Sequence, residues 1–267
     1  MLRIPYDSEE ARRINRRIFE TIYIGAMKAS IDLAEQYGPY ESFSGSPLSK
    51  GIFQFDMWKN GLDVDLMWAP EWEALRERVM KHGARNSLLL APMPTASTSQ
   101  IFDNYEAFEI HTSNLYKRET LAGEFVVVNK HLFKHLNELG LWNRRMVDRI
   151  IANNGSVQTI TDIPEDVRKI YKTVWETSQK IVIDMAADRA PFICQSQSMN
   201  IHMASPTLDQ IASLHLYAWK RGLKTGMYYL RTKAAKESVK VTVQEQKAND
   251  ATSCSIDNPE DCVVCSS

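Results

Sequence analysis

The segment on which we expect the fold to depend reads Asn86-Ser-Leu-Leu-Leu-Ala-Pro-Met-Pro-Thr-Ala-Ser-Thr-Ser-Gln-Ile101. Its apolar run, Leu88 to Ala91, predicts a buried strand that is broken by Pro92 and Pro94. Small hydroxyl residues follow, and they can cap a short helix. Backbone N–H groups at a helix start carry partial positive charge, so this segment could also bind phosphate without a lysine. From these residues alone, a capped helix and an anion site both remain open.

The composition is that of a folded protein with a substantial core: 267 residues, 44% hydrophobic and 24% charged. A net charge of −1 gives no general electrostatic reason to expect a nucleic-acid or membrane partner. We find no secretory signal and no apolar run of membrane-spanning length. Four cysteines do not make a disulfide framework for a chain of this size. We therefore expect a cytoplasmic protein.

Helical and extended patterns alternate along the chain. Ser8 is a candidate cap for a long helix that stops before Gly38, and Pro70 opens a second helix that ends near Gly83. Strands separated by helices of ten residues or more pair in parallel, so the pattern predicts an α/β fold. The other expected helices cover residues 130–139, 142–152, 164–189 and 206–222, and the expected strands cover residues 87–91, 125–128, 192–203 and 225–232.

The end of the chain differs in composition from the rest. Residues 236–267 lose apolar density and predict a flexible tail after a folded region of residues 1–235. The tail ends with a C-x-x-C pair, Cys262 and Cys265, which could be half of a zinc site or a dithiol redox couple. Only Cys254 lies near it and the tail has no histidine, so the sequence favours the redox couple. An inert exposed pair is the alternative.

Few other residues suggest chemistry by themselves. Tyr228 and Tyr229 would point to opposite faces of a strand, and core packing is the ordinary role of adjacent aromatic residues. The six histidines show no metal-ligand spacing, and there is no glycine-rich nucleotide loop. The sequence therefore predicts no metal site in this chain.

Six motifs occur in a fixed order along the chain: Ser44-Gly-Ser-Pro-Leu-Ser-Lys-Gly51, Ala91-Pro-Met-Pro-Thr-Ala-Ser-Thr-Ser-Gln100, Asn154-Gly-Ser-Val-Gln158, Gln195-Ser-Gln-Ser198, Gly222-Leu-Lys-Thr-Gly-Met-Tyr-Tyr-Leu-Arg-Thr232 and the terminal C-x-x-C. Together they resemble the large catalytic subunit of eukaryotic-type class I ribonucleotide reductase. The resemblance runs over essentially the whole chain but covers only the C-terminal part of that subunit. It implies the C-terminal half of a ten-stranded α/β barrel, followed by a flexible tail.

The resemblance also implies a role for two of these motifs in substrate binding and radical transfer. Tyr228 and Tyr229 would pass an electron and a proton between the radical-bearing small subunit and a cysteine beside the substrate. The hydroxyl segment would bind the diphosphate of a ribonucleoside diphosphate, in agreement with the anion interpretation. The residues implied for that contact are Pro94, Thr95, Ala96, Ser97 and Thr98.

By the same resemblance, Cys262 and Cys265 would reduce the active-site disulfide formed in each turnover. Thioredoxin or glutaredoxin would then reduce the tail by thiol–disulfide exchange. The family makes deoxyribonucleoside diphosphates for DNA replication, is homodimeric at full length, and depends on the small subunit's metal-radical centre and on ATP and dNTP effectors. This chain itself would bind no cofactor.

The resemblance also has gaps. The family's radical-forming cysteine and its disulfide-forming cysteines lie upstream of the matching region, so we expect the 267-residue chain to be inactive alone. Two alternatives stay open: a non-catalytic truncated paralogue that binds the small subunit or nucleotides, and a dithiol protein that uses only the tail. Positions that depart from the family's usual residues are Asp103, Tyr105, Ile110, His111, Ala190, Pro191, Cys194 and Ala218.

Overall fold

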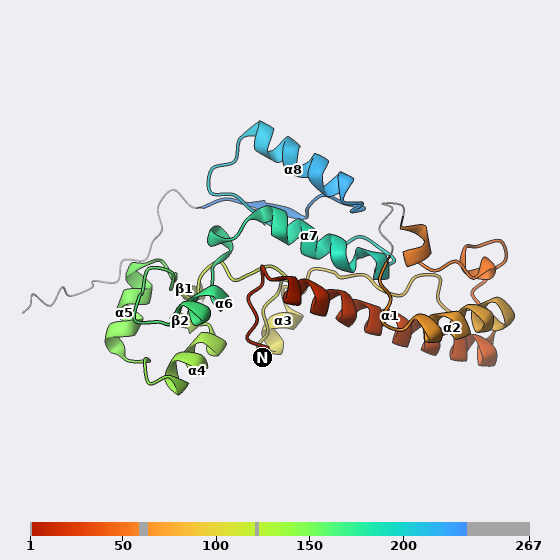
Figure 1. Cartoon of the computed structure of the whole chain (residues 1–267), viewed down its shortest axis with the longest axis horizontal. Helices are drawn as coiled ribbons and strands as arrows, with labels where there is room; N and C mark the ends of the chain where they lie inside the picture. The colour runs from red at the N-terminus through yellow and green to blue at the C-terminus, as the bar shows by residue number, and fades with distance from the viewer. Residues whose placement is uncertain (1, 59–63, 121–122, 234–267) are drawn as a thin grey trace, which may run out of the picture.

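The computed structural model describes residues 2–58, 64–120 and 123–233. Helices and strands in these ranges form three groups, each around its own hydrophobic cluster (Figure 1). The helices are α1 (Glu9–Tyr37), α2 (Ala69–His82), α3 (Thr98–Ile101), α4 (Lys130–Glu138), α5 (Arg144–Ala152), α6 (Glu165–Ile170), α7 (Gln179–Arg189) and α8 (Leu208–Lys220), with 3₁₀-helices η1 (Leu48–Lys50), η2 (Phe55–Met57), η3 (Val174–Glu176) and η4 (Ala190–Phe192). The strands are β1 (Leu115–Thr120), β2 (Gly123–Val128), β3 (Asn200–His202) and β4 (Tyr229–Arg231).

The first group packs α1 against α2, which lie side by side in Figure 1. The Ser8 hydroxyl accepts the N–H of Ala11 at 3.1 Å, and Gly38 ends α1 with a φ of 79°. Trp72 on α2 is fully buried and packs against Tyr23 of α1 and Phe55 of η2. Both helices were predicted from their caps and breakers, and both predictions are confirmed.

The second group, at one end of the molecule, packs α4, α5 and α6 around a hairpin of β1 and β2 (Figure 1). Leu115 pairs with Val128 in an antiparallel register. Only two residues separate the strands, and such a short connection permits only antiparallel pairing. The strand expected at residues 125–128 is confirmed, whereas β1 was missed because it carries a polar run, Lys117 to Thr120.

The third group contains α7, β3, α8 and β4, in that order along the chain. β3 and β4 pair in parallel with Asn200 opposite Tyr229, and α8 connects them, so the predicted parallel pairing is confirmed here. The paired segments are shorter than the predicted strands. At the start of the first one, Pro191 begins the turn of η4 and removes that part from extended structure.

The predicted strand at residues 87–91 is wrong. The segment is extended, but its backbone contacts with the chain that follows η4 are few: Gln195 N–H donates to Leu90 O at 3.2 Å, and Ser198 N–H donates to Pro92 O at 2.8 Å. Pro92 and Pro94 have no N–H to donate, so a continuous ladder cannot form.

The single helix predicted for residues 164–189 is also wrong, because the structure has α6, η3 and α7 in its place. The Glu176 carboxylate accepts the N–H and the hydroxyl of Thr173 at 2.7 and 2.9 Å. This capping box starts a new turn at Thr173 and interrupts the helical pattern.

The described strands form two separate two-stranded sheets, and the described residues do not close into a barrel. Among these residues, no helix combines the length and apolarity needed to cross a bilayer. The predicted tail, residues 236–267, lies outside the described residues.

Candidate functional site

The hydroxyl segment borders a cavity of about 480 Å³, lined by residues between Ala91 and Glu109 together with Ser198. The Thr95 hydroxyl donates to Glu106 O at 3.3 Å, which connects the start of the segment to the chain that follows α3. Asn104 N–H donates to Ser99 O at 2.8 Å and closes the short helix α3. The segment therefore forms a closed loop, residues 92–109, which we call the hydroxyl loop.

The hydroxyl loop presents hydrogen-bond donors that the protein does not use. Within the described residues, the backbone N–H groups of residues 96–98 have no acceptor, and the buried Ser99 hydroxyl has no partner. The Ser97 side chain makes no capping hydrogen bond, so the interpretation as a side-chain-capped helix is not supported. No lysine or arginine lines the cavity. The loop thus offers N–H and hydroxyl groups to an anion without a cationic side chain.

Two buried charged residues, Glu109 at the end of this loop and Arg189 beside Phe108, were missed by sequence reasoning. Glu109 is 4% exposed and accepts the N–H of Asn200 at 2.8 Å; its burial raises the pKa of its carboxyl group. Arg189 is 2% exposed, its guanidinium lies 4.5 Å from the centre of the Phe108 ring, and burial lowers its pKa. A charged residue flanked by Phe108 and Ile110 was the only sequence signal for a buried Glu109.

Asp103 is one of the positions that depart from the family's usual residues, and the structure accommodates it. Its φ is 51°, a left-handed conformation that aspartate tolerates better than most residues. Lys130 Nζ contacts both its carbonyl at 2.5 Å and its carboxylate at 2.7 Å. These contacts anchor the turn that follows α3.

The tyrosine pair does not divide between two faces as predicted, because β4 begins only at Tyr229. The two ring centres lie 4.1 Å apart with the planes inclined at 55°. A hydrogen bond between the two phenols raises the pKa of Tyr228. Tyr228 and Tyr229 are 48% and 50% exposed, so the core-packing interpretation is wrong for this structure. Tyr228 is held through its N–H, which donates to Met199 O at 2.6 Å.

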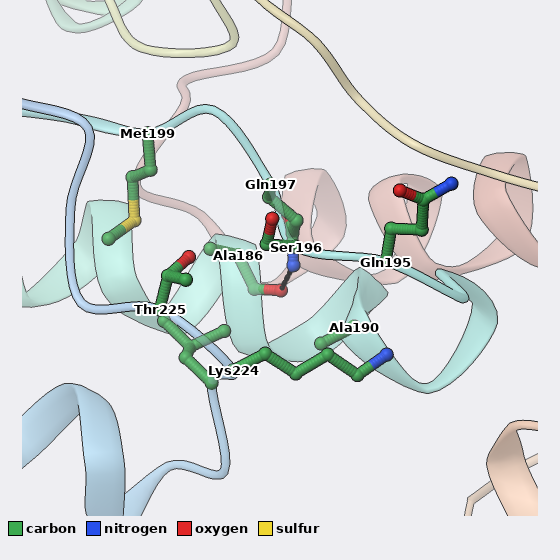
Figure 2. Close-up of a pocket in the computed structure, with 9 residues that line it drawn as sticks. Ala186, Ala190, Gln195, Ser196, Gln197, Met199, Lys224 and Thr225 are labelled. Carbon is green, nitrogen blue, oxygen red and sulfur yellow. Dashed lines mark hydrogen bonds between the residues drawn. The ribbon is translucent and has the colours of Figure 1, made fainter.

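The motif at residues 195–198 and the motif at residues 222–232 meet at a second cavity of about 10 Å³ (Figure 2). Gln197 Nε2 donates to Ala186 O at 2.9 Å, which fixes this segment to α7. The Lys224 side chain runs along Ala190, and its Nζ donates to the carbonyls of Ile193 and Cys194 at 2.8 Å. The contact fixes the loop before the tyrosine pair.

Cys262 and Cys265 lie outside the described residues. Within the part of the chain that is described, no group of three or more histidine, cysteine, aspartate or glutamate side chains could hold a metal ion.

Comparisons with known proteins agree on one family. Residues 1–229 match the family model described as ribonucleotide reductase, barrel domain. The chain is 59% identical over 246 residues to the ribonucleoside-diphosphate reductase large chain of Cryptosporidium parvum, covering 92% of this chain and 30% of that one. It is 49% identical to the large subunit of Danio rerio, covering 100% and 35% of the two chains.

A solved structure supports the same fold. The alpha subunit of the Actinobacillus ureae class Id ribonucleotide reductase superposes with a TM-score of 0.64 and 30% identity, covering 87% of this chain and 36% of that one. This chain therefore spans about a third of the length of the curated relatives that it matches.

Proposed function

Because this chain belongs to the ribonucleotide reductase family through its barrel domain, we propose that it forms part of the large subunit of a ribonucleoside-diphosphate reductase. The substrate is a ribonucleoside diphosphate, and the product is the corresponding 2′-deoxyribonucleoside diphosphate. The observation that carries this proposal is the hydroxyl loop in a chain of this family. Its Thr95, Thr98 and Ser99 line a cavity of about 480 Å³, and within the described residues the Ser99 hydroxyl has no hydrogen-bond partner.

In this proposal, Pro94, Thr95, Ala96, Ser97 and Thr98 hold the diphosphate. Neighbouring N–H dipoles and hydroxyl groups stabilise the negative charge, as they do where phosphates bind at helix starts. Among the described residues, no cationic side chain lines the cavity and two carboxylates, Glu106 and Glu109, do, so in this proposal the anion contact falls to the neutral donors alone.

The tyrosine pair serves as the relay for the radical. A phenol that loses an electron also releases its proton, and the close contact of the Tyr228 and Tyr229 rings gives each ring a neighbour for that exchange. Half-exposure of both rings supports contact with groups from outside this chain. Those groups are the small subunit on one side and a substrate-adjacent cysteine of the complete large subunit on the other.

Cys262 and Cys265 act as the reducing dithiol. Their two thiols pass two electrons and two protons to an active-site disulfide and become a disulfide themselves, which thioredoxin or glutaredoxin then reduces. We further propose the second half of a ten-stranded barrel, a homodimeric full-length subunit, regulation by ATP and dNTPs, dependence on the small subunit's metal-radical centre, and a cytoplasmic location.

A chimera tests this function. This chain replaces the matching region of the Cryptosporidium parvum large chain, and CDP reduction is measured with the small subunit and thioredoxin. The proposal expects activity, loss of activity in Tyr228→Phe, and no loss in Glu77→Gln, an exposed control on α2. A folded chimera that binds CDP and the small subunit but does not reduce CDP would favour the non-catalytic paralogue instead.

The same chimera tests the tail separately. The double variant Cys262→Ser with Cys265→Ser should lose turnover driven by thioredoxin but keep turnover driven by dithiothreitol, because a small dithiol reaches the active-site disulfide directly. An equal loss of turnover with thioredoxin and with dithiothreitol would contradict the proposed role of the tail.

A further inference from the structure

The strand β3 has two edges, and different parts of the chain use them. Along one edge β3 pairs with β4. Along the other edge, alternate N–H groups point away from β4, because the hydrogen-bonding direction alternates along a strand. Ser198 N–H donates to Pro92 O at 2.8 Å, Asn200 N–H to Glu109 Oε1 at 2.8 Å, and His202 N–H to Gln179 Oε1 at 2.8 Å.

Two of these three acceptors are the ends of the hydroxyl loop. Pro92 precedes the phosphate-binding residues and Glu109 follows them, and their partners on the edge, Ser198 and Asn200, are only two residues apart. The loop is therefore closed on β3 by a backbone carbonyl at one end and a side-chain carboxylate at the other. Glu109 makes the second closure alone, with Oε2 also 3.5 Å from Asn200 Nδ2.

The opposite edge of β3 holds the tyrosine pair. Asn200, whose N–H binds Glu109, is the register partner of Tyr229, and Met199 O accepts the N–H of Tyr228 at 2.6 Å. One short strand thus lies between the hydroxyl loop and the two phenols. The contact of Glu109 with Asn200 fixes the C-terminal end of the hydroxyl loop to that strand.

We propose that Glu109 is a positioning residue, which sets the conformation of the diphosphate-binding loop by closing it on the edge of β3 opposite the tyrosine pair. The inference rests on the proposed function of that loop. Glu109 touches no reacting group itself; it acts through Asn200 at one end and through the backbone that leads to Glu106 and Thr95 at the other.

The chemistry of the contact provides the test variants. Glu109→Gln keeps an amide oxygen that can accept the Asn200 N–H, whereas Glu109→Ala removes the acceptor and leaves a buried N–H unpaired. Glu109→Asp keeps the carboxylate but is one methylene shorter. Glu77→Ala removes an exposed carboxylate on α2, outside the loop and its cavity lining, and serves as the matched control.

The experiment uses the full 267-residue chain, with inorganic pyrophosphate as the probe. Pyrophosphate affinity is measured by calorimetry, and amide hydrogen exchange is followed by NMR at Asn200 and at residues 96–98. We expect Glu109→Ala to weaken binding about tenfold, because a loop that is no longer held in place must be ordered by the ligand, at a cost in binding free energy. Exchange at Asn200 should accelerate in the same variant. Glu109→Gln should restore both to nearly the wild-type values, with Glu109→Asp between them.

The outcomes separate this inference from the function on which it rests. A wild-type chain that binds no pyrophosphate contradicts the proposed phosphate loop. In that case the positioning role of Glu109 is judged from hydrogen exchange: faster exchange at residues 96–98 in Glu109→Ala supports the role, and unchanged exchange overturns it. Binding that is equally tight in wild type and Glu109→Ala overturns the positioning role and leaves the phosphate loop intact. Failure of Glu109→Gln to restore the Asn200 amide also overturns it.

Discussion

Around Glu20 the protein pairs its buried polar atoms, whereas around β3 it leaves several of them unpaired. The Glu20 carboxylate is 1% exposed and accepts the N–H groups of Met67 and Trp68 at 2.9 Å and the Trp72 indole N–H at 3.2 Å. Among the described residues, the buried side-chain atoms near β3 and its neighbouring loops that lack a hydrogen bond are Tyr6 OH, Ser99 Oγ, Asn200 Oδ1 and His202 Nδ1.

The difference separates a region that stabilises the fold from one that keeps polar groups available. An unpaired buried polar atom costs free energy, so a native protein that keeps several together has another use for them. The region around Glu20 holds α1 and α2 together, and the region around β3 carries the hydroxyl loop.

Trp72→Ala should have the largest effect, a loss of about 3–5 kcal/mol in the free energy of unfolding, because a fully buried aromatic side chain leaves a cavity. Urea unfolding followed by circular dichroism measures it. Trp219→Ala is the control: this tryptophan is 72% exposed, and its replacement should change stability by less than about 0.5 kcal/mol. Similar losses in both variants would contradict the assignment of the core.

Glu20→Gln should cost about 2 kcal/mol, because the amide NH₂ that replaces one carboxylate oxygen faces a backbone donor, the Met67 or Trp68 N–H. The same urea titration measures this loss. The exposed Glu77→Gln variant should stay within about 0.5 kcal/mol of wild type. If Glu20→Gln left the free energy of unfolding unchanged, this carboxylate would not be the acceptor that holds α1 and α2 together.

His202 should make stability depend on pH. Burial, with a smaller contribution from Arg231, lowers the pKa of His202 from 6.5 to about 4. The unfolded chain therefore takes up a proton first, so this contribution to stability is complete above pH 6.5 and is lost as the pH falls from 6.5 towards 4. We expect a decrease of about 2 kcal/mol between pH 7.5 and pH 5 that is absent in His202→Gln. Parallel pH profiles of the two proteins would refute this.

Ser99→Ala should have the smallest effect on stability, less than about 0.5 kcal/mol, because the buried hydroxyl has no protein partner to lose. Thermal unfolding without ligand measures it. The same variant should bind pyrophosphate more weakly than wild type if the hydroxyl is kept for an anion. A loss of stability above about 1 kcal/mol would mean that Ser99 is paired within the protein after all.

The elements that could be predicted from the sequence are those whose ends carry a local signal. Ser8 and Gly38 bound α1, and the parallel pairing of β3 with β4 follows from the helix between them. β1 could not be predicted, because the run from Lys117 to Thr120 has no apolar alternation and is held in place by its partner strand. The prediction of a strand at residues 87–91 was wrong for the opposite reason: these residues are apolar, but no neighbouring segment forms a continuous hydrogen-bond ladder with them.

The candidate site divides in the same way. The hydroxyl loop could be found because its chemistry lies in consecutive residues, Thr95 to Ser99. Glu109 could not, since its role depends on a contact with Asn200, which lies 91 residues away in the chain. The close contact of the Tyr228 and Tyr229 rings was missed because it depends on the residue at which β4 begins.

The occupied second edge of β3 also affects how molecules of this protein meet one another. A strand edge with free N–H groups is a template on which another chain can add, and this is a common route to aggregation. At β3 an incoming strand would first have to displace two acceptors, contributed by Glu109 and Gln179, and Pro92 O occupies the N–H of Ser198 just before the strand. The acceptors that shape the loop thus also protect this strand from intermolecular pairing.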